Sequence, residues 1–182
     1  MIINFLIIIQ VMYDESNDAY VRSKKVCGGG IPYFQKLYRK AQNARIPLVK
    51  KWYRLFFKLA RDKRHIELAV DTSIGPGLYF GHAYCITINP AAVIGKNINL
   101  HKGVTIGQEN RGIREGTPVI GDNVWIGVNA TVVGAIRIGN DVLIAPNTYV
   151  NCDVPDHSIV FGNPCIIKHR DNATEGYINR TI

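Results

Sequence analysis

A histidine, His82, stands in the segment GLYFGHAYCITIN, between Gly81 and Ala83. The ordinary pKa of histidine lies close to neutral pH, so its neutral ring can accept a proton under physiological conditions. Such a ring can take the proton of a hydroxyl group while the hydroxyl oxygen attacks an acyl carbon. A histidine in a turn can also make one backbone hydrogen bond and do no chemistry. The residue alone leaves both interpretations open.

The other histidines are His65, His101, His157 and His169. His65 lies in the charged run RDKRH, His157 follows Pro155, and His169 lies between Lys168 and Arg170. We interpret these three as solvated turn or tail residues. His101 differs, because the repeat described below places it near His82.

The four cysteines, Cys27, Cys85, Cys152 and Cys165, show neither a CxxC pair nor metal-ligand spacing. We therefore expect free thiols in a reducing, cytoplasmic location, and no metal site. The formal net charge is +8, with the excess before residue 66. This charge favours an anionic partner, but no nucleic-acid-binding motif and no Walker A or Rossmann glycine pattern is present, so we expect no nucleic acid.

An aliphatic or aromatic residue recurs every six positions from residue 74 to about residue 155. One run contains Ile120, Ile126, Val132, Ile138, Ile144 and Val150. Period six is neither helical nor strictly alternating, and it fits short strands separated by tight turns, with one side chain inward per unit. Each unit buries too little alone, so the units must stack into a solenoid, with three units per coil and about four coils.

Two irregularities interrupt the repeat. Ile86 and Ile88 are only two residues apart, and fourteen residues separate Ile106 from Ile120. The second irregularity predicts a protruding loop over roughly residues 108–118.

The residues before the repeat indicate two helices. Residues 31–64 carry the apolar stripe Tyr33, Phe34, Leu37, Tyr38 and Ala41, and Pro47 permits a second helix with Trp52, Leu55, Phe56 and Leu59 on its apolar face. We favour a helical cap that packs on the solenoid or on a neighbouring subunit. The alternative is a basic amphipathic element on an anionic membrane, a peripheral contact that we do not favour. The apolar residues 2–12 are too few to span a bilayer, and we interpret them as a helix or strand that covers its neighbours.

The segments IGPGLYFGHAYCITINPAAVIG, GVTIGQENRG and VPDHSIVFGNP resemble the hexapeptide-repeat acyltransferases, over residues 66–168. The likeness is to serine O-acetyltransferases and equally to O-acetyltransferases of polysaccharide pathways. It implies a left-handed parallel β-helix, which is an exception to the right-handed crossover rule. The expected organisation is a helical segment at 1–65, a β-helix at 66–168 and a tail at 169–182, assembled as a homotrimer.

The resemblance implies that His82 is the catalytic general base. An acidic residue usually precedes this histidine in serine acetyltransferases, and Gly81 stands there instead. Counting across the two-residue slip, Phe80 and Leu100 fall on one face of successive coils, about 4.8 Å apart. His101 should therefore lie one rung from His82, where it either binds the acceptor or assists the base, or serves only as a ladder residue.

The resemblance also assigns substrate sites. In serine acetyltransferases the protruding loop carries an Arg-His pair that contributes to acceptor binding; here the matched positions are Gly116 and Thr117, with Arg111 and Arg114 nearby. The expected acceptor-binding residues are therefore His101, Arg111, Arg114 and Thr117. Acetyl-CoA is expected in a groove between subunits, and no other cofactor is expected. Its expected contacts are Gly127, Ala130, Ala145, Gly162, Asn163, Pro164, Lys168 and Arg170.

Together these features predict an acetyl-CoA-dependent O-acetyltransferase. L-serine, giving O-acetylserine for cysteine biosynthesis, is the leading acceptor, and a sugar hydroxyl of a surface polysaccharide is the alternative. A third hypothesis is a β-helix scaffold without catalysis, which a CoA-binding measurement would separate from an enzyme.

Overall fold

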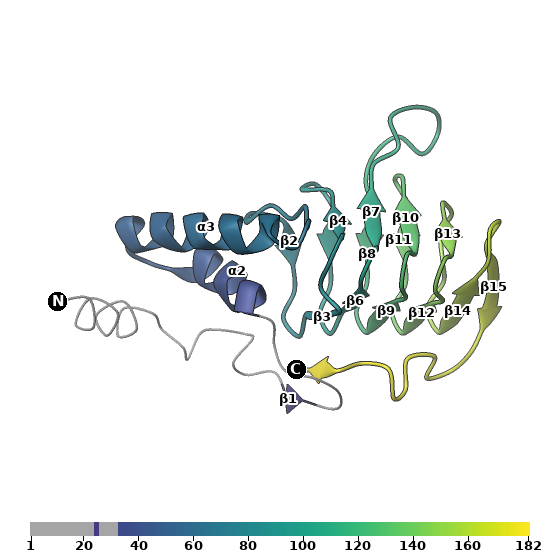
Figure 1. The fold of residues 1–182 in the computed structure, drawn as a ribbon. Helices are drawn as coiled ribbons and strands as arrows, with labels where there is room; N and C mark the ends of the chain where they lie inside the picture. The colour runs from purple at the N-terminus through teal and green to yellow at the C-terminus, as the bar shows by residue number, and fades with distance from the viewer. Residues whose placement is uncertain (1–23, 26–32) are drawn as a thin grey trace.

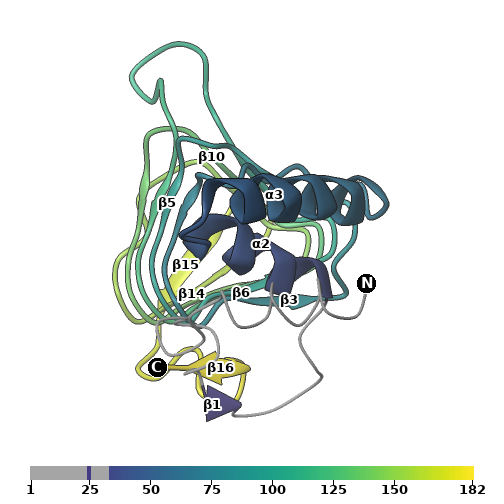
Figure 2. The same cartoon turned by 90° about the vertical axis from the view of Figure 1, so that its left-hand side faces the viewer.

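The computed structural model describes residues 24–25 and 33–182 of the 182-residue chain. The apolar segment at 2–12 and Cys27 lie outside the described residues. The described chain forms a parallel β-helix with two helices at one end and a tail that returns along it (Figure 1). Viewed along its axis, the β-helix has a triangular outline (Figure 2).

Three parallel sheets form the three sides of the β-helix. The first sheet contains β2 (Ser73–Ile74), β5 (Val93–Ile94), β8 (Val119–Ile120) and β11 (Arg137–Ile138). The second sheet contains β3 (Tyr79–Gly81), β6 (Asn99–His101), β9 (Val124–Ile126), β12 (Val142–Ile144) and β14 (Ser158–Phe161), followed by the antiparallel β15 (Ile166–His169). The third sheet contains β4 (Thr87–Ile88), β7 (Thr105–Gly107), β10 (Thr131–Val133) and β13 (Tyr149–Val150).

The solenoid predicted from the six-residue period, and the parallel β-helix implied by the resemblance, are confirmed, but there are about five turns rather than about four. The difference arises at the ends. Glu67 bridges to Thr87 before the first full coil, and Val154 bridges to Ile138 after the fourth. β14 then extends the second sheet by one more strand. The alternation of inward aliphatic and outward polar residues fades at both ends, so the period alone underestimated the length.

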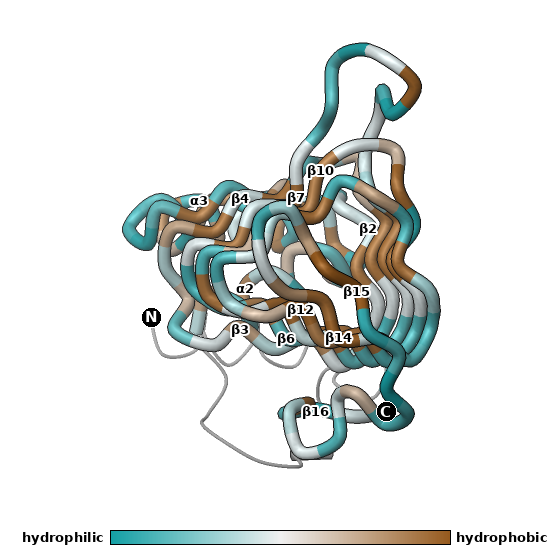
Figure 3. The backbone as a smooth tube through the Cα atoms, turned by 90° about the vertical axis from the view of Figure 1, so that its right-hand side faces the viewer, coloured by the Kyte–Doolittle hydropathy of each residue, from teal (hydrophilic) through white to brown (hydrophobic). Residues whose placement is uncertain are grey.

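The core is a set of stacked aliphatic rungs, visible as bands along the tube in Figure 3. In the second sheet, the register places Phe80, Leu100, Ile126, Ile144 and Val160 above one another, and each is at most 1% exposed. The predicted equivalence of Phe80 and Leu100 is confirmed. Close packing of these rungs holds successive coils in register.

Two helices cap the first coil: α2 (Tyr33–Asn43) and α3 (Pro47–Asp62), which begins at the proline that the sequence indicated. The ring of Phe34 packs on Phe80 at 5.1 Å between centroids. Gln35 donates a hydrogen bond to the carbonyl of Leu78, and Arg39 donates to the carbonyl of Ile74. Helix α2 therefore closes the open end of the apolar core.

Helix α3 packs on α2 with a different face from the one predicted. Its buried residues are Val49, Tyr53 and Phe57. The predicted contact residues are exposed instead: Trp52, Leu55, Phe56 and Leu59. In the described part of the chain, neither helix combines the length and the apolar character needed to cross a bilayer.

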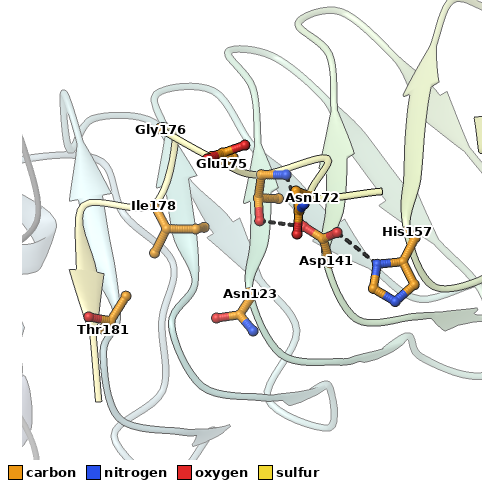
Figure 4. Close-up of a pocket in the computed structure, with 9 residues that line it drawn as sticks. Asn123, Asp141, His157, Asn172, Glu175, Gly176, Ile178 and Thr181 are labelled. Carbon is orange, nitrogen blue, oxygen red and sulfur yellow. Dashed lines mark hydrogen bonds and ion pairs between the residues drawn. The ribbon is translucent and has the colours of Figure 1, made fainter. Parts of the chain in front are cut away.

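The tail runs back along the β-helix toward the helical end, where β16 (Arg180–Thr181) pairs with β1 (Lys24–Lys25). Asp141 holds the tail against the β-helix. Its carboxylate accepts hydrogen bonds from the backbone N–H of Ala173 and from both the backbone N–H and the hydroxyl of Thr174. His157 Nδ1 lies 2.8 Å from the same carboxylate. A hollow of about 520 Å³ remains between tail and coils (Figure 4).

Candidate active site

His82 lies immediately after β3, at the corner where the chain passes from the second sheet to the third. Its side chain is exposed, and its φ of 51° is in the left-handed region, as is that of Cys85 at 53°. Histidine adopts this region more readily than most non-glycine residues. Ala83 is 3% exposed, so its methyl group is buried at the corner. The backbone N–H of Cys85 donates a hydrogen bond to the carbonyl of Arg64. The turn therefore holds the His82 backbone and presents its ring to solvent.

The ring of His101 fills the space beside Gly81. β3 and β6 pair in register, with Gly81 opposite His101. A Cβ atom added to Gly81 would lie 2.5 Å from Cε1 and 2.6 Å from Nδ1 of the His101 ring. The backbone of Gly81 is not in the left-handed region, so the neighbouring ring, and not the local conformation, requires glycine here. His101 is thus diagonal to His82, on the adjacent rung, as predicted.

His101 is wedged between Gly81 and two aromatic residues that sequence reasoning missed. Its ring lies 4.7 Å from the ring of Trp125, and Trp125 lies 5.3 Å from the ring of Tyr177 in the tail. In the sequence, the only feature that could have indicated Trp125 is its position between the two inward residues of the motif VWI, which turns its aromatic ring outward. Tyr177 could not have been found, because it is brought there by the path of the tail.

Burial lowers the pKa of His101 below its ordinary value of 6.5, and the nearby His82 lowers it further. His101 is therefore neutral at neutral pH. Its Nε2 atom is buried and has no hydrogen-bond partner among the described residues. A neutral imidazole in this position can accept or donate one hydrogen bond without adding charge next to His82.

A straight row of outward positions runs along the corner at His82. Successive registers align Gly81, His101, Gly127, Ala145 and Phe161 on five adjacent rungs. Four steps of ~4.8 Å give the row a length of about 19 Å. The His101 ring occupies the start of the row, and the small residues Gly127 and Ala145 on the next two rungs can lie under an extended chain.

The predicted coenzyme contacts separate into surface and core positions. Gly127 lies on the row, and a Cβ added there would meet Pro146 N at 2.6 Å. Ala145 is half-buried on the next rung. Ala130, in contrast, is 0% exposed. Its methyl group is part of the apolar core, so the prediction that Ala130 lines a ligand groove is not supported.

The far end of the row is the exposed turn Gly162–Pro164, which connects β14 to β15. Lys168 lies near this end, with its ammonium 5.7 Å from the ring centroid of Phe161. Arg170 lies at the other end of the same hairpin, where its N–H donates to the carbonyl of His157. Arg170 is therefore two residues beyond Lys168 and directly follows β15, at the end of the hairpin that is remote from the turn.

The predicted loop is present between β7 and β8, and it projects from the corner between the third and first sheets (Figures 1 and 2). Paired backbone hydrogen bonds between Glu109 and Gly116 close its base. Arg114 donates to the carbonyl of Asn151, and the hydroxyl of Thr117 donates to the carbonyl of Ala91. Arg114 and Thr117 therefore anchor the loop, whereas Arg111 is exposed.

The loop and His82 occupy different corners of one chain, with the third sheet between them. A groove of about 470 Å³ runs along this sheet, lined at one end by Arg61 and Glu67 and at the loop base by Asn89 and Gln108. Within one chain, the arginines of the loop and the two histidines do not converge on one point. A second copy of the chain would be needed to bring a loop to His82.

Comparisons with known proteins agree with this geometry. Residues 117–152 match the family model described as bacterial transferase hexapeptide (six repeats). The chain is 33% identical over 123 residues to a serine acetyltransferase of Staphylococcus aureus, which covers 68% of this chain and 58% of the relative. It is 35% identical over 99 residues to serine acetyltransferase 4 of Arabidopsis thaliana, covering 54% of this chain and 28% of the relative.

Solved structures show the same fold. The serine acetyltransferase of Neisseria gonorrhoeae in complex with serine has a TM-score of 0.57 at 30% identity, covering 74% of this chain and 53% of that one. The soybean apoenzyme has a TM-score of 0.61 at 27% identity, covering 75% and 58%. The chain thus spans little more than half the length of the solved relatives.

The contact between Gly81 and His101 makes a testable prediction. Gly81→Ala should lower the free energy of unfolding by about 1–3 kcal/mol, because the added methyl group displaces a ring that Trp125 prevents from moving away. His101→Ala opens this space, so the double variant Gly81→Ala/His101→Ala should lose much less stability than the two single effects combined. Urea denaturation of the four proteins measures this coupling. Additive effects would show that the ring does not occupy the space beside Gly81.

Proposed function

The chain belongs to the hexapeptide-repeat transferase family, and on this premise we propose that it is an acetyl-CoA-dependent O-acetyltransferase with His82 as its general base. The observation that carries the proposal is the position of His82. An exposed imidazole stands at the head of a straight corner whose outward positions include the small residues Gly127 and Ala145, over which an extended thioester can lie. Neither a solvated turn histidine nor a scaffold face requires this arrangement.

The reaction needs one proton acceptor. His82 takes the proton from the acceptor hydroxyl while the hydroxyl oxygen forms a bond to the thioester carbonyl carbon. The carbon–sulfur bond then breaks, and the protonated His82 returns the proton to the departing CoA thiolate. His101 remains neutral beside it, and its ring fills the space next to Gly81.

The coenzyme arm is proposed to lie along the row from His82 past Gly127 and Ala145 to the turn Gly162–Pro164. Lys168 near the far end supplies a cation for a phosphate, as a charge-assisted hydrogen-bond donor. Ala130 is left out of this site, because it lies in the core. Arg170, two residues beyond Lys168, is kept as a second cation for a phosphate.

L-serine is the acceptor that the comparisons favour, since the similar proteins are serine acetyltransferases. Free serine carries an α-carboxylate, and leaving that charge unpaired in a closed groove costs several kcal/mol. The loop positions Gly116 and Thr117 carry no cation, and Arg114 is already bound to Asn151. Arg111 is the arginine left to meet a carboxylate. If it does not, a sugar hydroxyl, which needs no cation, becomes the acceptor.

The proposed assembly is a homotrimer, in which the loop of one subunit lies over the His82 corner of the next. Two observations support it. In one chain the loop and His82 lie at different corners of the β-helix. Ile113 at the loop is 100% exposed, which is unusual for an isoleucine in a complete oligomer. A neighbouring corner would cover this side chain.

Replacing His82 tests the base. His82→Ala should reduce kcat by about 10² to 10⁴, the usual contribution of a general base, while the affinity for acetyl-CoA stays within a few-fold of wild type. Steady-state kinetics and calorimetric titration with CoA measure the two effects. Turnover at the wild-type rate in this variant would remove His82 from the role and make His101 the first replacement to test.

The oligomeric state is a separate test. Sedimentation equilibrium at micromolar concentration should give about 61 kDa, three times the chain mass of 20.3 kDa. Ile113→Asp should shift the equilibrium toward smaller species, because it places a charge in the covered contact. A stable wild-type monomer with full activity would contradict the shared site.

The choice of acceptor can be decided with two arginine variants. If L-serine is the substrate, Arg111→Ala should raise the KM for L-serine at least about tenfold, and hydrolysis of acetyl-CoA without acceptor should not change. Arg114→Ala is the comparison variant, because it removes the hydrogen bond that anchors the loop and leaves the exposed cation Arg111 in place. No transfer to L-serine at roughly tens of millimolar, alongside tight CoA binding and transfer to a sugar, would assign the glycan acceptor instead.

A further inference from the structure

Helix α3 has an apolar face that no described residue covers. Five large side chains along one side of the helix follow the spacing i, i+4, i+7, i+8 and i+11. They are Leu48, Trp52, Leu55, Phe56 and Leu59, between 43% and 64% exposed. The rings of Trp52 and Phe56 stack at 6.0 Å on this face. An exposed patch this continuous marks an interaction surface rather than isolated surface residues.

The helix has three distinct sides. Val49, Tyr53 and Phe57 face α2, where Phe57 packs on Tyr38 at 5.4 Å. The exposed apolar face lies next to this buried side on the helical wheel. The remaining side carries Lys51 and Lys58, together with Arg54, which pairs with Asp71 at 2.8 Å. The apolar face therefore has lysines along one border and α2 along the other.

Helix α2 supplies cations along that second border. The ammonium of Lys40 lies 5.6 Å from the ring centroid of Tyr53, and Lys36 is exposed one turn earlier. Positive side chains thus lie on two sides of α3, with Lys51 and Lys58 on one side and Lys40 of α2 next to Tyr53 on the other. Lysine stems can lie along apolar surface while their ammonium groups reach outward to anions.

The charge of the whole chain is concentrated in this cap. Residues 33–62 contain nine lysines and arginines and a single acidic residue, Asp62, which gives a net charge of +8. The whole chain also has a net charge of +8, so the remainder is neutral overall. A second copy of the cap would meet the first with the same high positive charge, and residues 66–182 have a net charge of only −2. The apolar residues 2–12 carry no charge that could pair with the lysines. An occupant that is anionic and apolar at once complements both the lysines and the apolar face.

We propose that the outer face of α3, flanked by the lysines of α2 and α3, docks on an anionic phospholipid bilayer. Leucine, tryptophan and phenylalanine side chains would enter the boundary between headgroups and acyl chains, and the lysines would contact the phosphates. With 16 residues, α3 is about 24 Å long and would lie in the plane of the membrane. This inference does not depend on the proposed acetyltransferase activity.

Vesicle flotation of the full chain tests the proposal. The protein should float with vesicles of phosphatidylcholine mixed with phosphatidylglycerol, but not with phosphatidylcholine alone, and added salt should weaken the binding. Trp52→Glu/Phe56→Glu should abolish it. Lys51→Gln/Lys58→Gln should weaken it about thirtyfold, since each lysine near an anionic surface contributes ~1 kcal/mol.

The matched control substitutions are made outside the helical cap. Ile166→Glu replaces an aliphatic side chain of similar exposure on β15 by a charged one, and Lys96→Gln/Arg137→Gln removes two positive charges from the first-sheet side of the solenoid. Both should bind vesicles as wild type does. Circular dichroism confirms that each variant is folded before it is compared.

A second readout uses the unmodified chain. Brominated lipids should quench tryptophan emission when the protein binds, and Trp52→Tyr should retain binding but lose most of the quenching, because Trp125 lies on the second sheet. Wild-type protein that stays soluble with both vesicle compositions would overturn the proposal. So would a Trp52→Glu/Phe56→Glu variant that floats normally but sediments as a smaller species, which would assign the face to a contact between subunits.

Discussion

The stacking of short parallel strands in one fixed register is the constraint on which the rest of the molecule depends. Each strand contributes one inward aliphatic residue, and the residue above it on the next coil has the same role. A slip of one residue would turn these side chains to the solvent and bury polar ones. Because the register cannot slip, the corners of the triangle stay aligned, and a row of outward positions becomes a straight surface that starts at His82.

The same constraint explains the unusual pair at the head of this row. Residues on adjacent rungs are so close that a side chain at Gly81 and the ring at His101 cannot both be accommodated. The chain has the imidazole ring at position 101 and no side chain at position 81. Burial and the proximity of His82 hold the His101 ring neutral. Where serine acetyltransferases usually place an acidic residue before the catalytic histidine, this chain therefore has an uncharged imidazole from the next coil.

Charge divides the molecule into two parts with different expected partners. The solenoid with its tail, residues 66–182, has a net charge of −2, and within it Lys168 is a local cation near the proposed position of the coenzyme phosphates. The helical cap, residues 33–62, has a net charge of +8 and an apolar face that no described residue covers. With this division, the enzyme would bind its small substrates along the His82 corner of the β-helix, and the helical cap would determine whether it binds to a membrane.

The sequence by itself determined the stacked coils of the solenoid, the loop near residues 108–118 and the adjacency of His101 to the His82 rung, because a six-residue period specifies which residues stack. The apolar stripes on either side of Pro47 determined the two helices. It could not determine which face of α3 is buried, since Val49, Tyr53 and Phe57 are as apolar as the residues left exposed. Nor could it show that Tyr177 reaches Trp125, or that Ala130 lies in the core. Those features depend on contacts between segments far apart in the chain and on the reversal of direction at β15, where the six-residue period no longer applies.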